Sequence, residues 1–294
     1  MGQLTVLFCG ATGRLAGLTP VLLERGHRVL AATREPRSAR AQQLRERGAQ
    51  VVRVDFDEVA SLTAAAGQVD AVVAAGTAHA AGPANDLRHG RNVVDAARAA
   101  GVGQLIYLTV AGADRATGVP IMDSKHALER YLRDAGVPHT IISPVYFMEN
   151  LWNAWNAPVL ATGRLPSPVS RFKPLQQIPI EDVLAFTARV LESRDAMLGE
   201  RIEIASDEIT AQQSAEIVSR LLGRRIPVAD SAAASTNPLF AWLERTGTHV
   251  DIAALHRHYP ELRWHTFTDW TKTQDWSPLR PNSPRPEPGE TPVA

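Results

Sequence analysis

The chain contains a single cysteine and only three lysines among its 294 residues. One cysteine, Cys9, cannot form a disulfide within the chain, which fits a reducing compartment. Its place in an apolar run favours a small core side chain over a reactive thiol. Basic and acidic residues balance at 31 each, so the basic excess that neutralises a nucleic-acid backbone is missing. We therefore expect no nucleic-acid partner.

Long hydrophobic runs are also missing. No segment reaches the ~18 uninterrupted apolar residues that a membrane-spanning helix needs, and the first residues do not combine a basic stretch with the apolar core of a signal peptide. We expect a cytoplasmic protein without a membrane partner. The length is enough for one or two domains, each with its own core.

The first 145 residues alternate between short apolar runs and longer amphipathic stretches, which is typical of βα units around a parallel sheet. The pattern predicts an α/β fold with a doubly wound parallel sheet of the Rossmann type, in a domain spanning residues 1–145. Strands are expected at 4–8, 28–33, 51–56, 71–76, 104–110 and 140–145, and helices near 15–25, 38–47, 86–100 and 124–135. Several helices are followed by a glycine that suits a left-handed C-cap, namely Gly26, Gly48, Gly101 and Gly136.

This alternation loosens after residue 145. Residues 146–276 predict a smaller, mostly helical substrate domain, with some strands and helices that return to the first domain. The last stretch, 277–294, has six prolines and few apolar residues, so we expect a disordered tail.

A glycine-rich turn, GATGRLAG at residues 10–17, follows the first expected strand and opens the first helix. Gly10 and Gly13 let the backbone approach a pyrophosphate, and the start of a helix points unpaired N–H groups at it. The order of strand, turn and helix favours a dinucleotide site over a tight turn without ligand.

The residues at the end of the second strand distinguish NAD(H) from NADP(H). Thr33 and Arg34 occupy this strand end, with Arg37 close behind. An arginine here can pair with the 2′-phosphate of NADP(H), so NADP(H) is the preferred cofactor. Glu35 keeps NAD(H) open as an alternative, and Arg34 could instead be an ordinary solvated charge.

With these motifs in view, the chain resembles the NmrA-like group of atypical short-chain dehydrogenases/reductases. The resemblance implies a Rossmann domain that binds NADP(H) and a small C-terminal domain that closes over the nicotinamide. It also implies that members are either reductases or redox-sensing regulators without turnover. It covers most of residues 4–190 and rests on GATGRLAG, TREP, VDFDE, GRNVVDAARAAGVGQLIYLT, SKHALERYLRDAGVPHTIISPVYFMENL and IPIEDVLAF.

The resemblance also implies cofactor contacts. Ala16 stands where many members carry a third glycine, a change that we expect to affect packing and not binding. The implied contacts are Gly10, Thr12, Gly13, Arg14 and Leu15 for the pyrophosphate, Arg34 for the 2′-phosphate, Asp55 and Phe56 for the adenine, Ala75, Gly76 and Thr77 for the ribose side, and Lys125, Pro144, Val145, Tyr146 and Phe147 for the nicotinamide end.

The usual catalytic pair of short-chain reductases, a tyrosine and a lysine four residues apart on one helix, is missing. Hydride transfer is still possible without this pair, because a bound nicotinamide cofactor itself supplies the hydride. The residues four positions before Lys125, Lys173 and Lys272 are Ile121, Val169 and Thr268.

Three catalytic candidates remain, each with a plain structural alternative. Lys125 could bind the nicotinamide ribose or polarise a carbonyl, or it could be a surface residue paired with Glu129. Tyr146 could donate a proton at the ligand-binding edge of the sheet, or pack within the second domain. Thr109, after the fifth strand, could donate a proton to the substrate, or it could be a buried strand threonine. His126 is more typical of a solvated histidine than of an acid.

Two further groups of residues favour structure over chemistry. His256 and His258 lack a third ligand nearby in sequence, so no metal site is expected. Phe147, Trp152 and Trp155 could form an apolar wall for a substrate, but the seam between two domains is the favoured interpretation.

Two functions follow from these features. The first is an NADPH-dependent reductase that transfers a hydride to a small or medium apolar carbonyl, quinone or enone. The second is a non-enzymatic NADP(H) sensor that changes an interaction with a protein partner, and the missing tyrosine–lysine pair favours it. A homodimer is open in either case. The lack of an added DNA-binding module weighs against a sensor.

Overall fold

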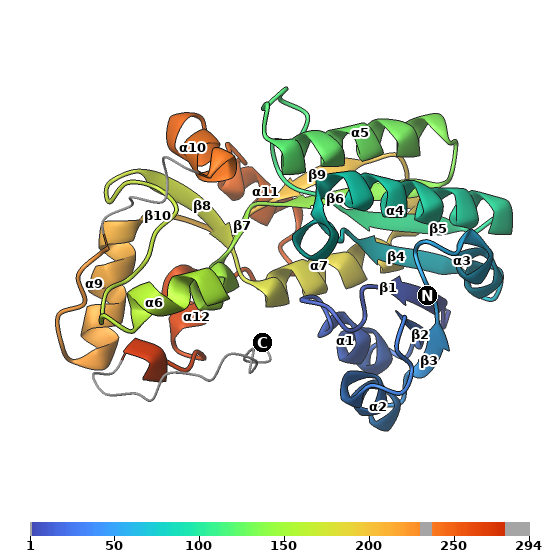
Figure 1. Ribbon diagram of the computed structural model, residues 1–294, viewed down its shortest axis with the longest axis horizontal. Helices are drawn as coiled ribbons and strands as arrows, with labels where there is room; N and C mark the ends of the chain where they lie inside the picture. The colour runs from blue at the N-terminus through green and yellow to red at the C-terminus, as the bar shows by residue number, and fades with distance from the viewer. Residues whose placement is uncertain (1, 230–236, 280–294) are drawn as a thin grey trace. The chain divides into compact units, whose positions relative to one another are not determined.

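The chain divides into two compact units in the computed structural model, which describes residues 2–229 and 237–279 (Figure 1). The first, called the Rossmann unit below, combines residues 1–144 with residues 183–203. The second, called the C-terminal unit, combines residues 145–182 with the described residues from 204 onward. The chain thus leaves the first unit after Pro144 and returns to it once.

The Rossmann unit is built on a seven-stranded sheet in the order β3-β2-β1-β4-β5-β6-β9, which confirms the predicted fold class. Neighbouring strands from β3 to β6 pair in parallel. The strands are β1 (Thr5–Cys9), β2 (Arg28–Thr33), β3 (Gln50–Arg53), β4 (Ala71–Ala75), β5 (Gln104–Leu108), β6 (His139–Pro144) and β9 (Arg201–Ile204).

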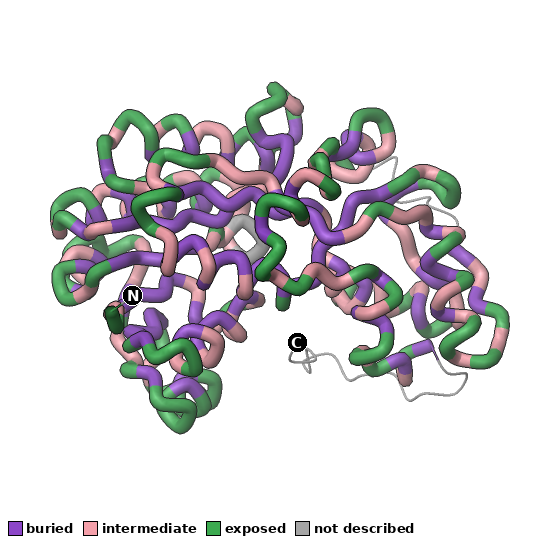
Figure 2. The backbone as a smooth tube through the Cα atoms, turned by 180° about the vertical axis from the view of Figure 1, so that it is seen from behind, coloured by how far each residue is buried: buried purple, intermediate pink, exposed green. Residues whose placement is uncertain are grey.

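Helices cover both faces of this sheet, with α3, α4 and α5 on one face and α1, α2 and α7 on the other (Figure 1). Strands enclosed in this way are apolar along their length, and all five residues of β5 are buried. Buried residues are drawn purple in Figure 2. The helices are α1 (Leu18–Glu24), α2 (Ala39–Glu46), α3 (Val59–Ala66), α4 (Ala78–Ala100), α5 (Pro120–Asp134), α7 (Ile180–Glu192) and α8 (Arg194–Met197).

Helix starts differ most from the sequence-based expectation. Within α4 the backbone is not helical at Gly82, so regular helix begins with Pro83, three residues earlier than expected. Helix α1 begins at Leu18 and not near residue 15, because successive turns occupy residues 13–17. Helix ends match better, since Gly26, Gly48, Gly101 and Gly136 all have the positive φ that favours glycine.

Helices α4 and α5 approach closely at Gly90. A Cβ built on this glycine would lie 2.4 Å from Cδ2 of Leu128, which is fully buried, and 3.0 Å from Oη of Tyr107. Gly90 lies one turn after Asp86 on α4, and Leu128 lies three residues after Lys125 on α5. The close approach therefore also brings Asp86 and Lys125 within reach of each other.

The C-terminal unit contains a three-stranded sheet in the order β10-β8-β7 and several short helices. Partly buried Trp152 packs against its core, with its ring centroid 5.1 Å from that of Trp276 and 6.3 Å from that of Trp270. The elements are β7 (Tyr146–Phe147), β8 (Pro174–Ile178), β10 (Asp207–Thr210), α6 (Ala157–Leu160), α9 (Ala211–Leu222), α10 (Pro238–Arg245), α11 (Ile252–His258), α12 (Phe267–Thr271) and the 3₁₀ helices η1 (Met148–Trp152), η2 (Ala154–Asn156) and η4 (Ser277–Leu279).

The predicted disordered tail is wrong for its first three residues. Ser277–Leu279 forms η4, and Leu279 is fully buried in the core of the C-terminal unit. The rest of the predicted tail, 280–294, lies outside the described residues.

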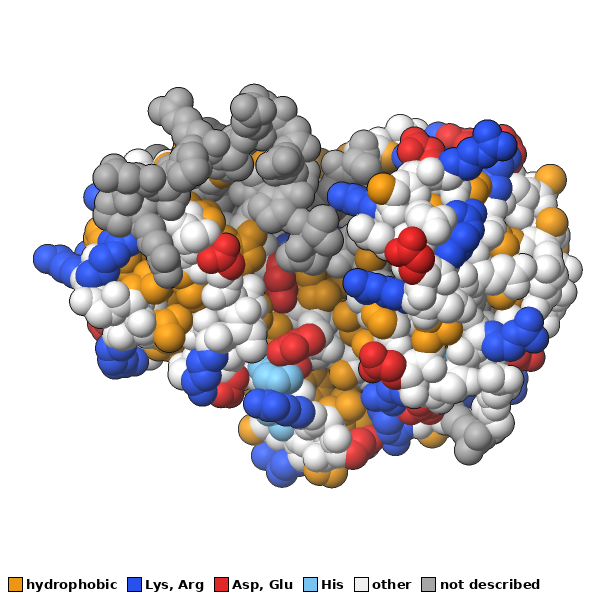
Figure 3. Space-filling view, turned by 90° about the horizontal axis from the view of Figure 1, so that it is seen from below, with side chains coloured by type: hydrophobic (Ala, Val, Ile, Leu, Met, Phe, Trp, Pro, Cys, Tyr) orange, Lys and Arg blue, Asp and Glu red, His pale blue; other side chains and the backbone are white. Residues whose placement is uncertain are grey.

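The described surface offers no extended face of one charge in the view of Figure 3, where basic and acidic side chains are interspersed. Among the helices of the described residues, none has the length and apolar content needed to span a bilayer.

Replacing Gly90 by alanine tests the contact between α4 and α5. Alanine favours a helix, yet its methyl group would overlap Leu128, so we expect a loss of roughly 1–3 kcal/mol in the free energy of unfolding. The double variant Gly90→Ala/Leu128→Ala should be more stable than the sum of the two single effects, because the second change removes the overlap. Urea unfolding of the four proteins measures both; simple additivity would contradict the overlap.

Candidate functional site

The glycine turn follows β1 and leaves backbone donors free. Gly10 has a φ of +139°, and the N–H of Gly13 donates to the carbonyl of Gly10 at 2.9 Å. The N–H groups of Thr12 and Leu15 donate to no acceptor among residues 2–229 and 237–279. Because buried or half-buried N–H groups rarely stay unpaired, two free donors in one turn fit a phosphate ligand. These donors belong to the turn itself, whereas the sequence predicted that the start of α1 would supply them.

The close-packed glycine of this turn is Gly17. A Cβ there would lie 2.8 Å from Cδ1 of Leu184 on α7. We expected the loss of a third glycine at Ala16 to affect packing, but the tight approach occurs one residue later, where a glycine is present.

Arg34, Arg37 and Arg40 follow β2 in the chain, and all three are exposed. Arg34 directly follows the strand, is exposed, and forms no ion pair or hydrogen bond with a described residue. Arg40 on α2 donates from Nη1 to the carbonyl of Thr12 at 3.1 Å. Arg40 was not predicted as a 2′-phosphate ligand, because such an arginine is expected at the strand end and not within the following helix.

Lys125 is buried, not on the surface. Its side chain is 8 % exposed, and Nζ lies 2.8 Å from Oδ2 of Asp86, whose side chain is fully buried. A Cβ on Gly76 would lie 1.6 Å from this Nζ, so the ammonium occupies the space that a side chain at residue 76 would fill. The alternative of an exposed lysine paired with Glu129 is therefore wrong. Gly76 follows β4, at the edge of the sheet where ligands bind in such folds.

Asp86 also orders the loop after β4. Its Oδ1 accepts a hydrogen bond of 2.6 Å from the N–H of Thr77. Burial and the nearby Asp86 carboxylate raise the pKa of Tyr107 well above its usual value, so this phenol stays protonated.

His89 on α4 joins the loops after β3 and β4. Its Nδ1 lies 3.0 Å from Oγ1 of Thr77, and its Nε2 lies 3.1 Å from Oδ1 of Asp57. The hydrogen bond from Arg88 lowers the pKa of Asp57 below its usual value. The ring of Phe56 meets His89 edge-on at 5.8 Å. The loop after β3, which also carries Asp55, and the loop of Ala75 and Thr77 are thus held together by a residue that the sequence analysis missed.

Thr109 gives its one proton to a buried carboxylate. Its Oγ1 donates to Oε1 of Glu129 at 2.7 Å and lies 2.7 Å from Oγ of Ser143. Glu129 is fully buried and also accepts from Nε of Arg201 at 2.8 Å. Glu129, the partner of Lys125 in the alternative interpretation, therefore binds Thr109 and Arg201 instead. His126, on the same helix, is half-buried.

The expected nicotinamide contacts fall in both units. Pro144 ends β6, and its carbonyl accepts from the N–H of Ala111 at 3.0 Å. Val145 begins the C-terminal unit, and Tyr146 and Phe147 form β7 within it.

The C-terminal unit contains a cavity of about 200 Å³. Tyr146 and Gln177 line it from the small sheet, and Trp155, Phe240 and Phe267 line it from other segments of the same unit. Trp155 therefore belongs to a cavity wall, whereas Trp152 packs against the core of the unit.

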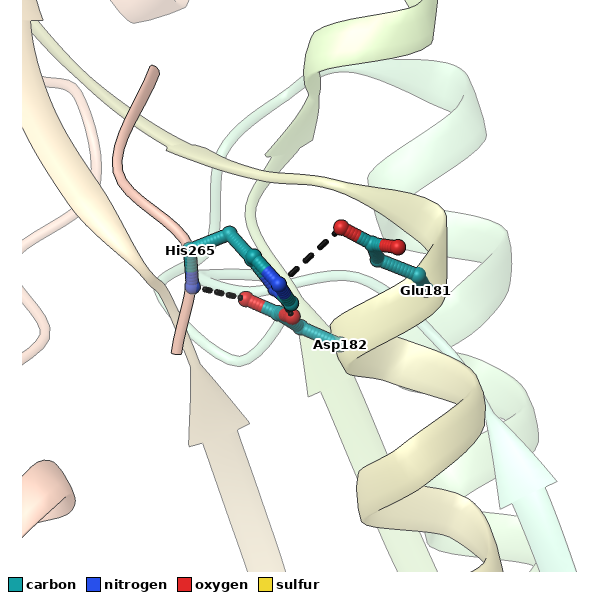
Figure 4. Close-up of side chains that lie close together, drawn as sticks. All are labelled: Glu181, Asp182 and His265. Atoms are coloured by element: carbon teal, nitrogen blue, oxygen red, sulfur yellow. Dashed lines mark hydrogen bonds and ion pairs between the residues drawn. The ribbon is translucent and has the colours of Figure 1, made fainter. Parts of the chain in front are cut away.

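A cluster of Glu181, Asp182 and His265 also lies in this unit (Figure 4). Nδ1 of His265 is 2.5 Å from Oδ1 of Asp182 and 3.2 Å from Oε1 of Glu181. Oδ2 of Asp182 accepts from the N–H of His265 at 2.8 Å and from Oγ of Ser206 at 2.5 Å. These bonds occupy both oxygens of Asp182, so the cluster fastens the segment before α12 to the start of α7.

The two histidines considered for a metal lie elsewhere. His256 stacks on Trp264 with ring centroids 4.8 Å apart, and His258 meets Tyr259 edge-on at 4.7 Å. Each contact accounts for its histidine as a packing residue.

Comparisons with known proteins show one family and several activities. The sequence profile of the NmrA-like family matches residues 2–233. Photosystem II assembly factor Ycf39 of Synechocystis is 27% identical over 192 residues, which are 64% of this chain and 58% of that protein. Quinone oxidoreductase 2 of Escherichia coli is 28% identical over 148 residues, 49% of this chain and 50% of that protein. The matches thus span about half the length of these relatives.

Solved structures with the same fold include an oxidoreductase and a regulator. The NADPH-dependent quinone oxidoreductase QOR2 of Escherichia coli, complexed with NADPH, has a TM-score of 0.77 at 22% identity, covering 91% of this chain and 98% of that one. The negative transcriptional regulator NmrA, in complex with NADP, has a TM-score of 0.68 at 18% identity, covering 94% of each chain.

Substituting Gly76 by alanine tests the buried ion pair. The new methyl group would displace the Lys125 ammonium from Asp86, so we expect the free energy of unfolding to fall by roughly 2–4 kcal/mol. Gly67→Ala is the matched control, because Gly67 has a φ of −68° and its Cβ would meet only the carbonyls of Thr63 and Ala64, at the ordinary contact distances of 3.5 and 4.0 Å. Urea unfolding compares the two. Equal effects would show that Gly76 does not accommodate the lysine.

Proposed function

The chain belongs to the NmrA-like family, and from this premise we propose that it is an NADPH-dependent reductase of small or medium apolar carbonyls, quinones or enones. The observation that carries the proposal is the buried Lys125 ammonium, held by Asp86 beside Gly76 at the ligand-binding edge of the sheet. Similar proteins that are named as quinone oxidoreductases, one of them as NADPH-dependent, support it.

Cofactor binding draws on the glycine turn and on two arginines. The free N–H groups of Thr12 and Leu15 would hold the pyrophosphate. Arg34 and Arg40 would pair with the 2′-phosphate, which NADH lacks. Arg40 already contacts the turn through Thr12. NADPH, when bound, supplies the hydride.

Lys125 would orient the reacting end. An ammonium has three donors, and Asp86 is the one carboxylate that ion-pairs with it among the described residues. The remaining donors could bind a ribose hydroxyl or polarise a substrate carbonyl. Reduction adds the hydride to the carbonyl carbon and a proton to its oxygen, and NADP⁺ is released. Since Thr109 gives its proton to Glu129, we assign Thr109 to loop positioning and keep Tyr146 as the candidate proton donor.

A regulator that senses NADP(H) is the second candidate. The absence of a tyrosine four residues before Lys125 favours it, because the position is occupied by Ile121. Relatives named as a transcriptional regulator and as an assembly factor also support it.

Cofactor preference is tested with Arg34→Ala and Arg40→Ala. Each change removes a charge-assisted contact to the 2′-phosphate, so NADPH affinity should fall roughly 10- to 100-fold while NADH affinity stays unchanged. Arg45→Ala, an exposed residue at the other end of α2, is the control and should alter neither. Calorimetric titration measures the affinities. Equal affinity of the unaltered protein for NADPH and NADH would refute the assignment.

Turnover separates the two candidate functions. NADPH absorbance is followed with a panel of quinones, enones and ketones, and we expect oxidation with at least one of them. Tyr146→Phe should lower kcat roughly 10²-fold or more if Tyr146 donates the proton, with NADPH affinity unchanged. Tight NADPH binding without oxidation in the panel would favour the sensor instead. Unchanged kcat in Tyr146→Phe would leave reduction in place but assign the proton to another donor.

A further inference from the structure

Two neighbouring glutamines on β8 have opposite environments. The amide of Gln176 exchanges two hydrogen bonds with the backbone of Val250: Nε2 donates to its carbonyl and Oε1 accepts from its N–H, both at 2.9 Å. The amide of Gln177 forms no hydrogen bond with any described residue. Gln177 is nevertheless only 8 % exposed. Adjacent residues of a strand point to opposite faces of the sheet, which explains how they differ.

The face that carries Gln177 forms a wall of the 200 Å³ cavity. Leu175 lies two residues earlier on β8 and lines the same cavity. Tyr146 of β7 pairs in register with Gln177, and Ile209 of β10 pairs with Leu175; both line the cavity as well. Gln176, on the other face, does not. Register and lining agree that the Gln177 side chain projects into the cavity.

The amide of Gln177 is left to the contents of the cavity. Neither of its polar atoms is among the fully buried atoms without a partner, so water or a ligand in the cavity can reach them. The surrounding lining is largely apolar and includes Trp155 and Phe267. A dry cavity of about 150 Å³ is large enough to accept benzene. A cavity of 200 Å³ thus has room for one or two rings. Of the two amides that line it, Asn156 donates to the carbonyl of Asn150, which leaves the amide of Gln177 to orient them.

We propose that this cavity binds a carbonyl compound with one or two rings, an aryl ketone or a cyclic enone, whose oxygen accepts a hydrogen bond from Nε2 of Gln177. Gln177 is then the residue that selects a carbonyl over a plain hydrocarbon. The identification of this ligand as the hydride acceptor rests on the proposed function; the binding itself requires no NADPH.

The test compares two ligands of the same size, 1-tetralone and tetralin, without cofactor. Binding is followed by tryptophan fluorescence, since Trp155 lines the cavity. In Gln177→Leu, affinity for 1-tetralone should fall about five- to tenfold, the loss of one hydrogen bond, while affinity for tetralin is unchanged or higher. Its unfolding midpoint should not fall, because the substitution removes an unpaired polar group.

Gln176→Leu is the matched control on the same strand. It leaves both backbone groups of Val250 without partners, so the unfolding midpoint should fall, while both ligand affinities of the folded protein stay unchanged. If Gln177→Leu fails to fold, Gln177→Met takes its place with the same expectation.

Three results would overturn the proposal: no binding of 1-tetralone to the unaltered protein, unchanged 1-tetralone affinity in Gln177→Leu, or an equal loss for both ligands. A turnover measurement distinguishes failure of the cavity proposal from failure of the proposed reductase function. Selective 1-tetralone binding without NADPH oxidation in the acceptor panel would support the cavity and reject the reductase. Reduction of an acceptor with the same KM in the unaltered protein and in Gln177→Leu would support the reductase and reject the cavity as its acceptor site.

Discussion

The missing side chain of Gly76 is the constraint on which the Rossmann unit's candidate site depends. The Lys125 ammonium fills the space beside this residue, and only a carboxylate as buried as Asp86 can compensate the lost hydration of such a charge. Asp86 in turn fixes the N–H of Thr77, so the backbone of the loop after β4 and the position of the lysine are set by one carboxyl group. The close contact between Gly90 and Leu128 holds the two helices that carry the pair.

In the C-terminal unit, too, buried polar groups have hydrogen-bond partners, and Gln177 contrasts with them. Asp182 has both oxygens occupied by His265 and Ser206, and Gln176 has its whole amide occupied by Val250. These buried polar groups join distant segments and are accounted for by the fold alone. Gln177 makes no such bond, so its amide has no structural task. A polar group that the fold does not use and that lines a cavity indicates where a ligand would complete the hydrogen bonding.

Local patterns in the sequence predicted the parallel sheet and most helix ends, because apolar runs and glycines act over a few residues. Contacts between distant segments could not be predicted in this way. The only partner considered for Lys125, as an alternative to a functional role, was Glu129, one turn away, whereas its partner Asp86 lies on another helix. His89 and Arg40 were missed for the same reason, since each acts on a loop from a neighbouring helix. The start of α1 was misplaced because consecutive turns resemble a first helical turn in sequence.

The return of the chain to the Rossmann unit adds β9, which replaces β6 as the last strand at one edge of the sheet. Strand β9 lies beside β6, where the N–H of Ile141 donates to the carbonyl of Glu200. A fragment cut after residue 145 would retain the glycine turn, Lys125 and six strands, yet it would expose the unpaired backbone of β6 to other chains. To produce the Rossmann unit alone, residue 144 must therefore be joined to residue 183 through a linker. Simple truncation after residue 145 would yield a sheet prone to self-association.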